Sequence, residues 1–272
     1  LRAHRERAAA GKAIRVIFII AEAGVNHGGD LGQAFLLANA AKEAGADAVK
    51  YQHFNSRRLW GDDRIAHLEL SEAEMANIAW HCKAIGIEFM CTPFGVPEVE
   101  FLTPLLRRWK VASGCLTNWP LLAAVRATGL PVILSTGMAD MDRIQAAVDA
   151  VAPTTLLHCT SAYPCPYAEV NLSAMDALRA RWGASCQIGY SDHTAGICIA
   201  LAAVGRGAAV LEKHLTLDRM AEGPDHKASI EPDSFRIMVS AIRDIEQALG
   251  HQEKRPQPSE AATIKAWYGD QW

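Results

Sequence analysis

The 272-residue sequence predicts an α/β protein, a single-domain (β/α)8 TIM barrel. The first observation is that eight short apolar runs alternate with stretches of helical character. The second is that these runs are almost wholly apolar, which is typical of parallel strands covered on both faces. The third is the length, which suits one barrel and requires no second large domain.

The apolar runs are short enough to be strands, and the segments between them are long enough to hold helices. Eight such units favour a closed barrel over a doubly wound open sheet, which is the alternative. The predicted strands are residues 16–24, 48–52, 87–93, 110–114, 131–137, 155–159, 187–192 and 209–215.

The segments between the runs carry the signals that start and stop helices. Asp30 is a suitable N-cap for a helix that ends before Gly45. Ser71 and Glu74 have the spacing of a capping box, and Gly86 follows the helix that they open. The predicted helices are residues 31–44, 71–84, 96–106, 120–127, 140–151, 171–181, 196–205 and 232–249.

Two polar tails flank the barrel. The expected parts are an N-terminal tail at 1–15, the barrel at 16–250 and a C-terminal tail at 251–272. The aromatic side chains of Trp267, Tyr268 and Trp272 disfavour water, so we expect the C-terminal tail to pack on this barrel or on a partner chain.

Composition excludes several classes of partner. A formal net charge of −3 argues against nucleic acid and against an anionic membrane surface. No apolar run is long enough to cross a bilayer, and the first residues lack the apolar centre of a signal peptide. The seven cysteines include no Cys-x-x-Cys pair, which indicates free thiols in a reducing compartment. We therefore expect a cytoplasmic protein.

Polar residues gather at the end of each predicted strand. In a barrel the carboxyl ends of the strands form one mouth, where active sites lie. A single Ser or Thr there commonly caps a helix, but polar residues at all eight ends indicate a binding site. The residues concerned include Glu22, Lys50, Gln52, Thr92, Lys110, Ser113, Ser135, His158, Ser161, Tyr163, Ser191, His193, Glu212 and His214.

His193 and His214 lie 21 residues apart, which is one strand-helix unit, and are expected on neighbouring strands. Two imidazoles that leave other positions open are able to hold a divalent ion that polarises a carbonyl. The alternative is a hydrogen-bonded pair of histidines without a metal. From the two histidines alone, that alternative is favoured.

Lys50 and Lys110 are expected at the same mouth. A lysine near a barrel centre is unfavourable unless it meets an anion, so the pair indicates an acidic or phosphorylated substrate. The alternative is that each lysine forms an ion pair with Glu22 or Glu212.

Three familiar motifs are excluded. Ser191, Asp192 and His193 are adjacent on a strand, so their side chains alternate between faces and cannot form a relay. Gly205 and Gly207 precede a strand instead of following one, which rules out a dinucleotide fingerprint. The sequence also contains no P-loop.

Nine sequence words in a fixed order resemble the N-acetylneuraminate (sialic acid) synthase family, from about residue 19 to residue 250. Each word alone is weak evidence, but their joint order is specific. They are AEAGVNHGGD (21–30), GADAVKYQ (45–52), CTPF (91–94), KVASG (110–114), LSTGM (134–138), LHCTSAYPCP (157–166), GYSDHTAG (189–196), EKHLTLD (212–218) and GPDHKAS (223–229).

The resemblance implies a transferase that forms a C–C bond in carbohydrate biosynthesis. Its substrates would be phosphoenolpyruvate and the aldehyde of an aldose or hexosamine, such as N-acetylmannosamine or a relative. The products would be a 3-deoxy-2-keto sugar acid and free phosphate, and the family implies a homodimer. The condensation would be assisted by a divalent metal, typically Mn²⁺, with Mg²⁺, Co²⁺ and Zn²⁺ as alternatives.

The resemblance also implies roles for particular residues. His193 and His214 would bind the metal, and Glu22 would be the acid/base residue beside it. The expected catalytic set is Glu22, Lys50, Lys110, His193 and His214. The groups that would hold the phosphate and carboxylate of phosphoenolpyruvate are Lys50, Thr92, Lys110, Ser113, Ser161 and Ser191. The remaining substrate-binding candidates are Gln52, Tyr163 and Asp225, of which the last two would contact the open-chain sugar.

Three departures separate this sequence from the family pattern, and one is His53, which stands where Thr or a similar residue is usual. Cys115 stands where the family commonly has Glu, and we expect the thiol to fill space instead of acting as a nucleophile. The family usually carries a C-terminal antifreeze-like domain that supplies an Arg to a partner's barrel, whereas this sequence ends at Trp272. We therefore expect one of three arrangements. Another chain supplies that domain, the sugar lacks the acyl group that the Arg would contact, or the C-terminal tail covers the mouth of the barrel.

Two other functions remain open at this point. One is a non-catalytic barrel that binds a sugar acid or a partner protein. The other is an aldolase that cleaves a 2-keto acid, although that chemistry usually needs a Schiff-base lysine in an apolar pocket. Both lysines here are expected among hydroxyl groups.

Overall fold

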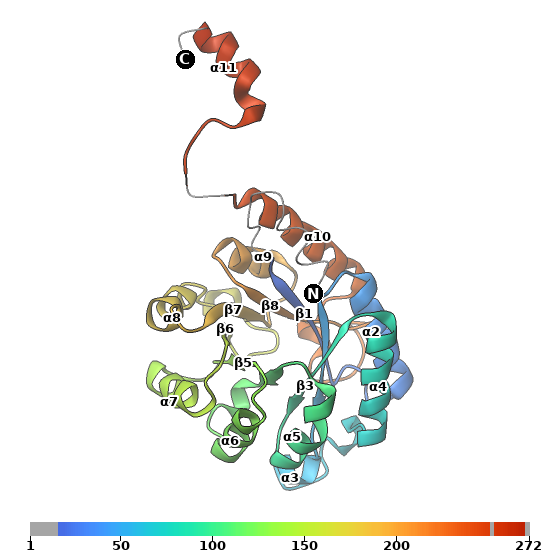
Figure 1. Cartoon of the computed structure of the whole chain (residues 1–272). Coiled ribbons are helices and arrows are strands. Elements are labelled where there is room, and N and C mark those ends of the chain that lie inside the picture. The colour runs from blue at the N-terminus through green and yellow to red at the C-terminus, as the bar shows by residue number, and fades with distance from the viewer. Residues whose placement is uncertain (1–15, 251–252, 270–272) are drawn as a thin grey trace.

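The computed structural model describes residues 16–250 and 253–269, in which the apolar runs form one parallel sheet of eight strands. The strand order is β3-β2-β1-β8-β7-β6-β5-β4, and the end strands β3 and β4 contact each other, so the described strands enclose a nearly closed barrel (Figure 1). The strands are β1 (Phe18–Gly24), β2 (Ala48–His53), β3 (Glu88–Pro93), β4 (Trp109–Val111), β5 (Val132–Ser135), β6 (Thr155–His158), β7 (Gln187–Asp192) and β8 (Val210–His214).

Helices surround the barrel and alternate with its strands (Figure 1). The TIM-barrel prediction is therefore confirmed. The helices that follow strands are α2 (Leu31–Glu43), α4 (Glu72–Ile85), α5 (Val96–Leu102), α6 (Trp119–Ala127), α7 (Met141–Val151), α8 (Ala174–Trp182), α9 (Cys198–Gly205) and α10 (Pro232–Ala248). A short helix, α3 (Ser56–Trp60), lies between β2 and α4 and was not predicted.

The predicted caps form as hydrogen bonds. The side chain of Asp30 accepts from the backbone N–H of Gln33 at 2.7 Å. Ser71 and Glu74 form a reciprocal capping box, in which Oγ of Ser71 accepts at 3.3 Å and the Glu74 carboxylate accepts at 2.8 Å. Gly86 ends the helix with φ of +75°, a conformation that glycine adopts without steric cost.

Several predicted boundaries were wrong for identifiable reasons. The fourth strand ends at Val111, and Ser113–Cys115 turns in a 3₁₀ helix. Helix α5 ends at Leu102 and passes into a 3₁₀ turn that contains Pro104, which has no N–H to continue the α-helix. Helices α8 and α9 begin later than predicted because Asn171 and Gly196 have positive φ.

The barrel interior is layered along the strand direction. The side chains of Ile20, Ala48, Met90, Ile133, Leu157 and Val210 form a buried apolar cluster inside the barrel. Because strand side chains alternate, the residue two positions later on each strand also points inward. Those next positions include Glu22 after Ile20, Lys50 after Ala48, and Glu212 after Val210. The strands therefore deliver a polar layer directly above an apolar floor.

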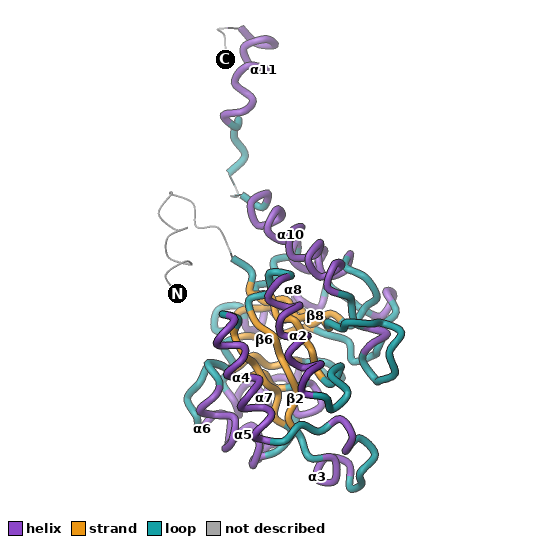
Figure 2. Tube along the Cα trace, turned by 90° about the vertical axis from the view of Figure 1, so that its right-hand side faces the viewer, coloured by secondary structure: helices purple, strands orange, loops and turns teal. Residues whose placement is uncertain are grey.

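The C-terminal tail contains a helix that the sequence reading did not anticipate, α11 (Ala261–Tyr268). It stands apart from the barrel in two perpendicular views (Figures 1 and 2), and Trp267 is 81% exposed. Packing of this aromatic residue on its own barrel was therefore a wrong expectation, while packing on a partner chain stays a prediction. Residues 1–15 and Trp272 lie outside the described residues.

Candidate functional site

A cavity of about 430 Å³ opens at the carboxyl ends of the strands. Its wall includes side chains from strands β1, β2, β3, β4, β5, β7 and β8 and from the segment after β6. All twelve predicted site residues line it, namely Glu22, Lys50, Gln52, Thr92, Lys110, Ser113, Ser161, Tyr163, Ser191, His193, His214 and Asp225. The structure thus brings the whole predicted set to one place.

Four charged side chains form a buried cluster at the base of the cavity. Lys50 Nζ lies 2.7 Å from Glu22 Oε2 and 3.5 Å from Glu212 Oε2. Lys110 Nζ lies 3.4 Å from Glu212 Oε1. All four are almost fully buried, so the ion pairing considered as an alternative for the lysines does occur. It does not remove the lysines from the cavity, which both still line.

The two carboxylates of this cluster have opposite electrostatic environments. Burial raises the pKa of Glu22 to about 7, because it outweighs the opposing attraction of Lys50. Burial also pushes the pKa of Glu212 upward, but the ammonium groups of Lys110 and Lys50 outweigh it and lower the pKa to about 2. Glu212 is therefore a fixed anion, whereas Glu22 is able to exchange a proton near neutrality.

Hydrogen bonds orient these charged groups. Lys50 Nζ donates to Thr92 Oγ1 at 3.0 Å. Gln52 Nε2 donates to Glu22 Oε1 at 3.1 Å, and Ser191 Oγ donates to Glu212 Oε1 at 2.7 Å. Glu212 was expected at the mouth and as an ion-pair partner of a lysine, but it was not among the predicted site residues. Its position between two lysines makes it a member of the site.

The imidazoles of His193 and His214 lie side by side, with ring centroids 5.4 Å apart. The ring of Tyr163 approaches both, at 4.3 Å from His193 and 5.6 Å from His214. Burial lowers the pKa of each histidine, so both rings are neutral near pH 7. Neutral imidazole is the form that binds metal ions.

His214 has a buried nitrogen without a hydrogen-bond partner, and the second nitrogen of His193 faces only a serine hydroxyl. Nδ1 of His193 lies 2.7 Å from the carbonyl oxygen of Thr160 and must donate to it, which leaves a lone pair on Nε2. Ser191 Oγ is 3.3 Å from that Nε2, but its single proton is directed to the anionic Glu212. Nδ1 of His214 is buried with no hydrogen-bond partner. The chemistry of the two rings is thus compatible with a divalent cation, and the metal stays a prediction.

The described part of the chain has no group of three or more His, Cys, Asp or Glu side chains that could hold a metal. Two imidazoles alone would leave the other positions of an ion to water and substrate oxygens. Asp225 Oδ2 lies 3.7 Å from Nδ1 of His214, and burial raises the Asp225 pKa to about 6. Asp225 is thus placed beside the pair as a polar neighbour.

A second polar group, which includes the cavity residues Ser113 and Ser161, gathers around Gly137. Its backbone N–H donates to Ser113 Oγ at 2.9 Å. A side chain at this position would overlap Ser113 Oγ and Ser161 Oγ, so only glycine lets these three donors converge. With the nearby ammonium of Lys110, such hydroxyl groups suit an anion.

The structure agrees with the exclusion of a catalytic triad and with the space-filling role expected of Cys115. Asp192 faces away from the cavity and bonds to Lys213 Nζ at 2.9 Å, so no relay through Ser191 and His193 exists. Cys115 is buried and does not line the cavity, and burial raises its pKa to about 11. It is a space-filling thiol.

One wall of the cavity was missed by the sequence reading because it is apolar. It comprises Val25, Phe54, Leu59, Trp60, Ile65, Leu68 and Phe94, with Met138 at the rim. Most of these residues come from the segment between β2 and α4, which contains α3 and shows no periodic pattern. The only sequence signal was its concentration of large apolar residues, and we refer to this set as the apolar wall.

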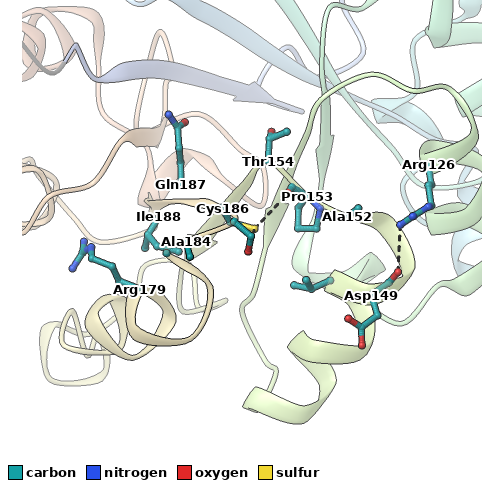
Figure 3. Close-up of a pocket in the computed structure, with 13 residues that line it drawn as sticks. Arg126, Asp149, Ala152, Pro153, Thr154, Arg179, Ala184, Cys186, Gln187 and Ile188 are labelled. Carbon is teal, nitrogen blue, oxygen red and sulfur yellow. Dashed lines mark hydrogen bonds between the residues drawn. The ribbon is translucent and has the colours of Figure 1, made fainter. Parts of the chain in front are cut away.

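A second cavity, of about 880 Å³, lies among the ends of α6, α7 and α8 and the starts of β6 and β7 (Figure 3). Its arginines are engaged by the fold. Arg126 donates to the carbonyl oxygens of Asp149 and Ala150 at the end of α7. Arg179 donates to the carbonyl oxygens of Arg206 and Gly207 after α9. These contacts cap helices at the amino-terminal face of the barrel, where residues commonly serve stability.

Comparisons with known proteins identify the family of the chain. Residues 37–254 match the NeuB family. The chain is 42% identical to the N,N'-diacetyllegionaminic acid synthase of Legionella pneumophila, over 89% of this chain and 76% of that protein. It is 37% identical to the human N-acetylneuraminate-9-phosphate synthase, over 90% of this chain and 74% of that protein.

A solved structure of a sialic acid synthetase has the same fold as this chain. The N-acetylneuraminic acid synthetase of Leptospira borgpetersenii, in complex with citrate, superposes with a TM-score of 0.86 at 38% identity, covering 92% of this chain and 90% of that one. None of the helices in the described residues combines the length and apolar character that crossing a membrane requires. On its family match, its relatives and its barrel, the chain belongs to the NeuB family and is a sialic-acid-synthase-like enzyme.

Proposed function

We propose that this enzyme condenses phosphoenolpyruvate with the aldehyde of a sugar, a hexosamine such as N-acetylmannosamine or a relative, to give a 3-deoxy-2-keto sugar acid and phosphate. The observation that carries the proposal is one cavity containing two ammonium groups, two neutral imidazoles and a carboxylate of raised pKa. The names of the relatives, which are synthases of sialic-acid-type sugars, support it.

In this proposal the anionic groups of phosphoenolpyruvate meet the two lysines. Lys110, Ser113 and Ser161 form one set of donors, and the N–H of Gly137 holds the Ser113 hydroxyl in place. Lys50 and Ser191 form a second set, in which Thr92 holds Lys50 in place and the Ser191 hydroxyl would turn from Glu212 to the bound anion. Charge-assisted hydrogen bonds to two separated anionic groups would fix the position and the orientation of the enol carbon.

His193 and His214 would hold the divalent ion, for which Mn²⁺ is the first choice and Mg²⁺, Co²⁺ and Zn²⁺ are alternatives. The fit rests on the unpartnered Nδ1 of His214 and on the lone pair at Nε2 of His193, whose other nitrogen donates to Thr160. When bound, the ion would supply Lewis acidity to the aldehyde oxygen, which the weakly nucleophilic enol requires. Tyr163, Gln52 and Asp225 would orient the sugar through its hydroxyl groups.

The bonds change in a balanced sequence. The C3 carbon of phosphoenolpyruvate forms a bond with the aldehyde carbon, whose oxygen takes up a proton, and positive charge develops at C2. Water then adds to C2 and loses one proton, which leaves a hydroxyl group on C2. The hydroxyl oxygen forms the keto C=O bond as the bond between C2 and the bridging oxygen breaks, and the hydroxyl proton goes to the leaving phosphate. The Glu22 carboxylate directs that water or stabilises the charge, and its raised pKa suits it to accept the proton.

The proposal extends to the assembly and compartment of the protein. A homodimer would give the exposed Trp267 of α11 a partner surface. All seven cysteines are free thiols, and six of them are buried, which suits a reducing cytoplasm.

The test is a screen of hexosamines and shorter aldoses with phosphoenolpyruvate and Mn²⁺. Phosphate release should require both an aldehyde and the metal, and mass spectrometry should detect an acid with the mass of the acceptor plus pyruvate. Binding of sugar acids without turnover for every acceptor would favour the non-catalytic barrel instead. Cleavage of a 2-keto acid that borohydride traps on a lysine would favour an aldolase.

A further inference from the structure

Cys159 belongs to the polar layer of the barrel but does not reach the cavity. Each of the six residues in the buried apolar cluster inside the barrel is followed, two positions later, by a residue that side-chain alternation also directs inward. These following residues are Glu22, Lys50, Thr92, Ser135, Cys159 and Glu212. Five of the six line the cavity, whereas Cys159, which comes directly after β6, does not. Its thiol therefore lies behind the cavity wall.

The Cys159 sulfur contacts a hydroxyl group that does line the cavity. Cys159 Sγ lies 3.2 Å from Ser113 Oγ. It also lies close to Gly137, because a side-chain carbon at that glycine would come within 3.0 Å of the sulfur. Cys159 is buried and its thiol is free. The thiol is thus packed against Ser113 from behind the wall of the proposed anion site.

The hydrogen bonds of the Ser113 hydroxyl allow two arrangements. A hydroxyl group has one proton and two lone pairs. One lone pair of Ser113 Oγ accepts from the N–H of Gly137 at 2.9 Å. If Ser113 donated to the sulfur of Cys159, its only proton would point away from the cavity. If the thiol donates instead, both lone pairs are occupied and the hydroxyl proton is left for an anion in the cavity.

The Cys159 thiol is in the protonated form that is able to donate. Burial raises the pKa of this thiol and outweighs the effects of Ser113 and of the Lys110 ammonium, which lower it. A thiolate here would place a buried negative charge next to the site that is to receive an anion, which is unfavourable. The neutral thiol is therefore the form compatible with substrate binding.

Ser191 shows the opposite arrangement in the same cavity. Its hydroxyl donates to the anionic Glu212 at 2.7 Å, so it has to turn before it meets a substrate anion. In the part of the chain that the structure describes, the hydrogen-bond contacts of Ser113 Oγ are Gly137 and Cys159, and neither is an anion. Ser113 is thus the hydroxyl group whose proton the protein is able to direct in advance.

We infer that Cys159 is a positioning residue, whose thiol donates a hydrogen bond to Ser113 and thereby directs the Ser113 hydroxyl proton to an anionic group of phosphoenolpyruvate. This inference rests on the proposed function and adds a residue to it. The thiol does not line the cavity, so it acts through Ser113 and affects the affinity for phosphoenolpyruvate instead of kcat. Loss of one neutral hydrogen bond should weaken that affinity about three- to tenfold.

The experiment compares Cys159→Ala with Cys159→Ser, two variants of similar side-chain volume of which only the second retains a donor. In Cys159→Ala, the Kd for phosphoenolpyruvate from calorimetry without aldehyde, and its KM, should rise about three- to tenfold, while kcat and the aldehyde KM change less than about twofold. Cys159→Ser should stay within about twofold of the wild type in all four constants. The control is Cys82→Ala, which removes a buried thiol from α4, away from the cavity, and should change none of them.

A double-variant comparison tests whether the effect passes through Ser113. In a Ser113→Ala background, Cys159→Ala should cause no further loss of affinity for phosphoenolpyruvate, because the hydroxyl that the thiol directs is gone. An undiminished effect in that background would overturn the inference. Equal affinities in Cys159→Ser and Cys159→Ala would also overturn it, because the thiol would then only fill space.

Circular dichroism checks the fold of each variant. If Cys159→Ala does not fold, Cys159→Ser decides, and an affinity for phosphoenolpyruvate reduced more than about threefold in that variant would overturn the inference. Absence of aldehyde-dependent phosphate release by the wild type with every acceptor would overturn the proposed function itself. Calorimetry measures phosphoenolpyruvate binding without turnover, so the two failures are distinguishable.

Discussion

The ammonium group of Lys50 and the carboxylate of Glu22 form a 2.7 Å ion pair between neighbouring strands, with both side chains almost fully buried. Glu212 lies 3.5 Å from the same ammonium and shares it. A buried lysine held by two carboxylates retains its charge, and the pKa of Lys50 is raised accordingly despite its burial. The cavity therefore keeps a cation ready for an anionic substrate.

Removing the other lysine should weaken phosphoenolpyruvate binding selectively. In Lys110→Ala, we expect KM for phosphoenolpyruvate to rise about 10- to 100-fold, the worth of a charge-assisted contact, and KM for the aldehyde to change less than about threefold. Steady-state kinetics with each substrate varied would measure both, with the exposed Lys83→Ala as control. Equal effects on both constants would contradict the role given to Lys110.

The metal assignment predicts a specific loss in His214→Ala. Turnover should fall at least about 100-fold and the affinity for Mn²⁺ should fall as well, because one of two imidazole ligands is gone. Titration of Mn²⁺ followed by electron paramagnetic resonance measures binding, and circular dichroism checks the fold. The control His67→Ala removes an exposed imidazole and should leave both unchanged. Wild-type Mn²⁺ affinity in His214→Ala would remove this assignment.

The pKa of Glu22 predicts how stability depends on pH in the metal-free enzyme. This carboxyl has a pKa of about 7 when folded, against an ordinary value of 4.5, so the folded state holds its proton more tightly. Its contribution to stability is therefore fully present below pH 4.5 and is lost as the pH rises through 7. Glutamine carries no titratable proton, so the Glu22→Gln variant should not lose this contribution to stability as the pH rises.

The free energy of unfolding of Glu22→Gln, relative to the wild type, should therefore increase by on the order of 2–3 kcal/mol from pH 5 to pH 8. Urea denaturation in the presence of a chelator measures it at each pH. The control Glu43→Gln changes an exposed carboxyl on α2 and should give a nearly constant difference. A constant difference for Glu22→Gln would show that Glu22 does not titrate as inferred.

The glycine at 137 predicts a steric effect on the anion site. Gly137→Ala places a methyl group against Ser113 Oγ and Ser161 Oγ and should raise KM for phosphoenolpyruvate at least about tenfold. Gly205→Ala is the matched control, because a methyl group there meets nothing within 4 Å and favours helix α9. Unchanged KM in Gly137→Ala would mean that these hydroxyl groups do not bind the substrate.

The sequence predicted the charged cluster at the base of the cavity well, because one rule determines which strand residues point into the barrel. Side chains alternate along a strand, so a polar residue two positions after an inward apolar one also points inward. Glu22 after Ile20 and Lys50 after Ala48 follow this rule, and a barrel gathers such positions at one end. Spacing along the chain was enough to place His193 and His214 together.

The apolar wall was not predictable in the same way. Leu59 and Ile65 lie in a segment without periodicity, and their contacts with Val25 and Phe94 join distant parts of the chain. The sharing of Lys50 between two carboxylates also depends on distances of a few ångströms, which residue spacing does not define. Boundaries at Pro104 and Asn171 were misplaced because local backbone conformation decided them.

The most direct test of the account is the origin of the oxygen in released phosphate. The reaction is run in ¹⁸O-labelled water with phosphoenolpyruvate and N-acetylmannosamine, with and without Mn²⁺, and the phosphate is analysed by mass spectrometry. The account predicts phosphate only when both the aldehyde and the metal are present, and that phosphate should contain no solvent oxygen, because water attacks C2. Phosphate that forms without an aldehyde, or that carries one labelled oxygen, would contradict it, because water would then have attacked phosphorus.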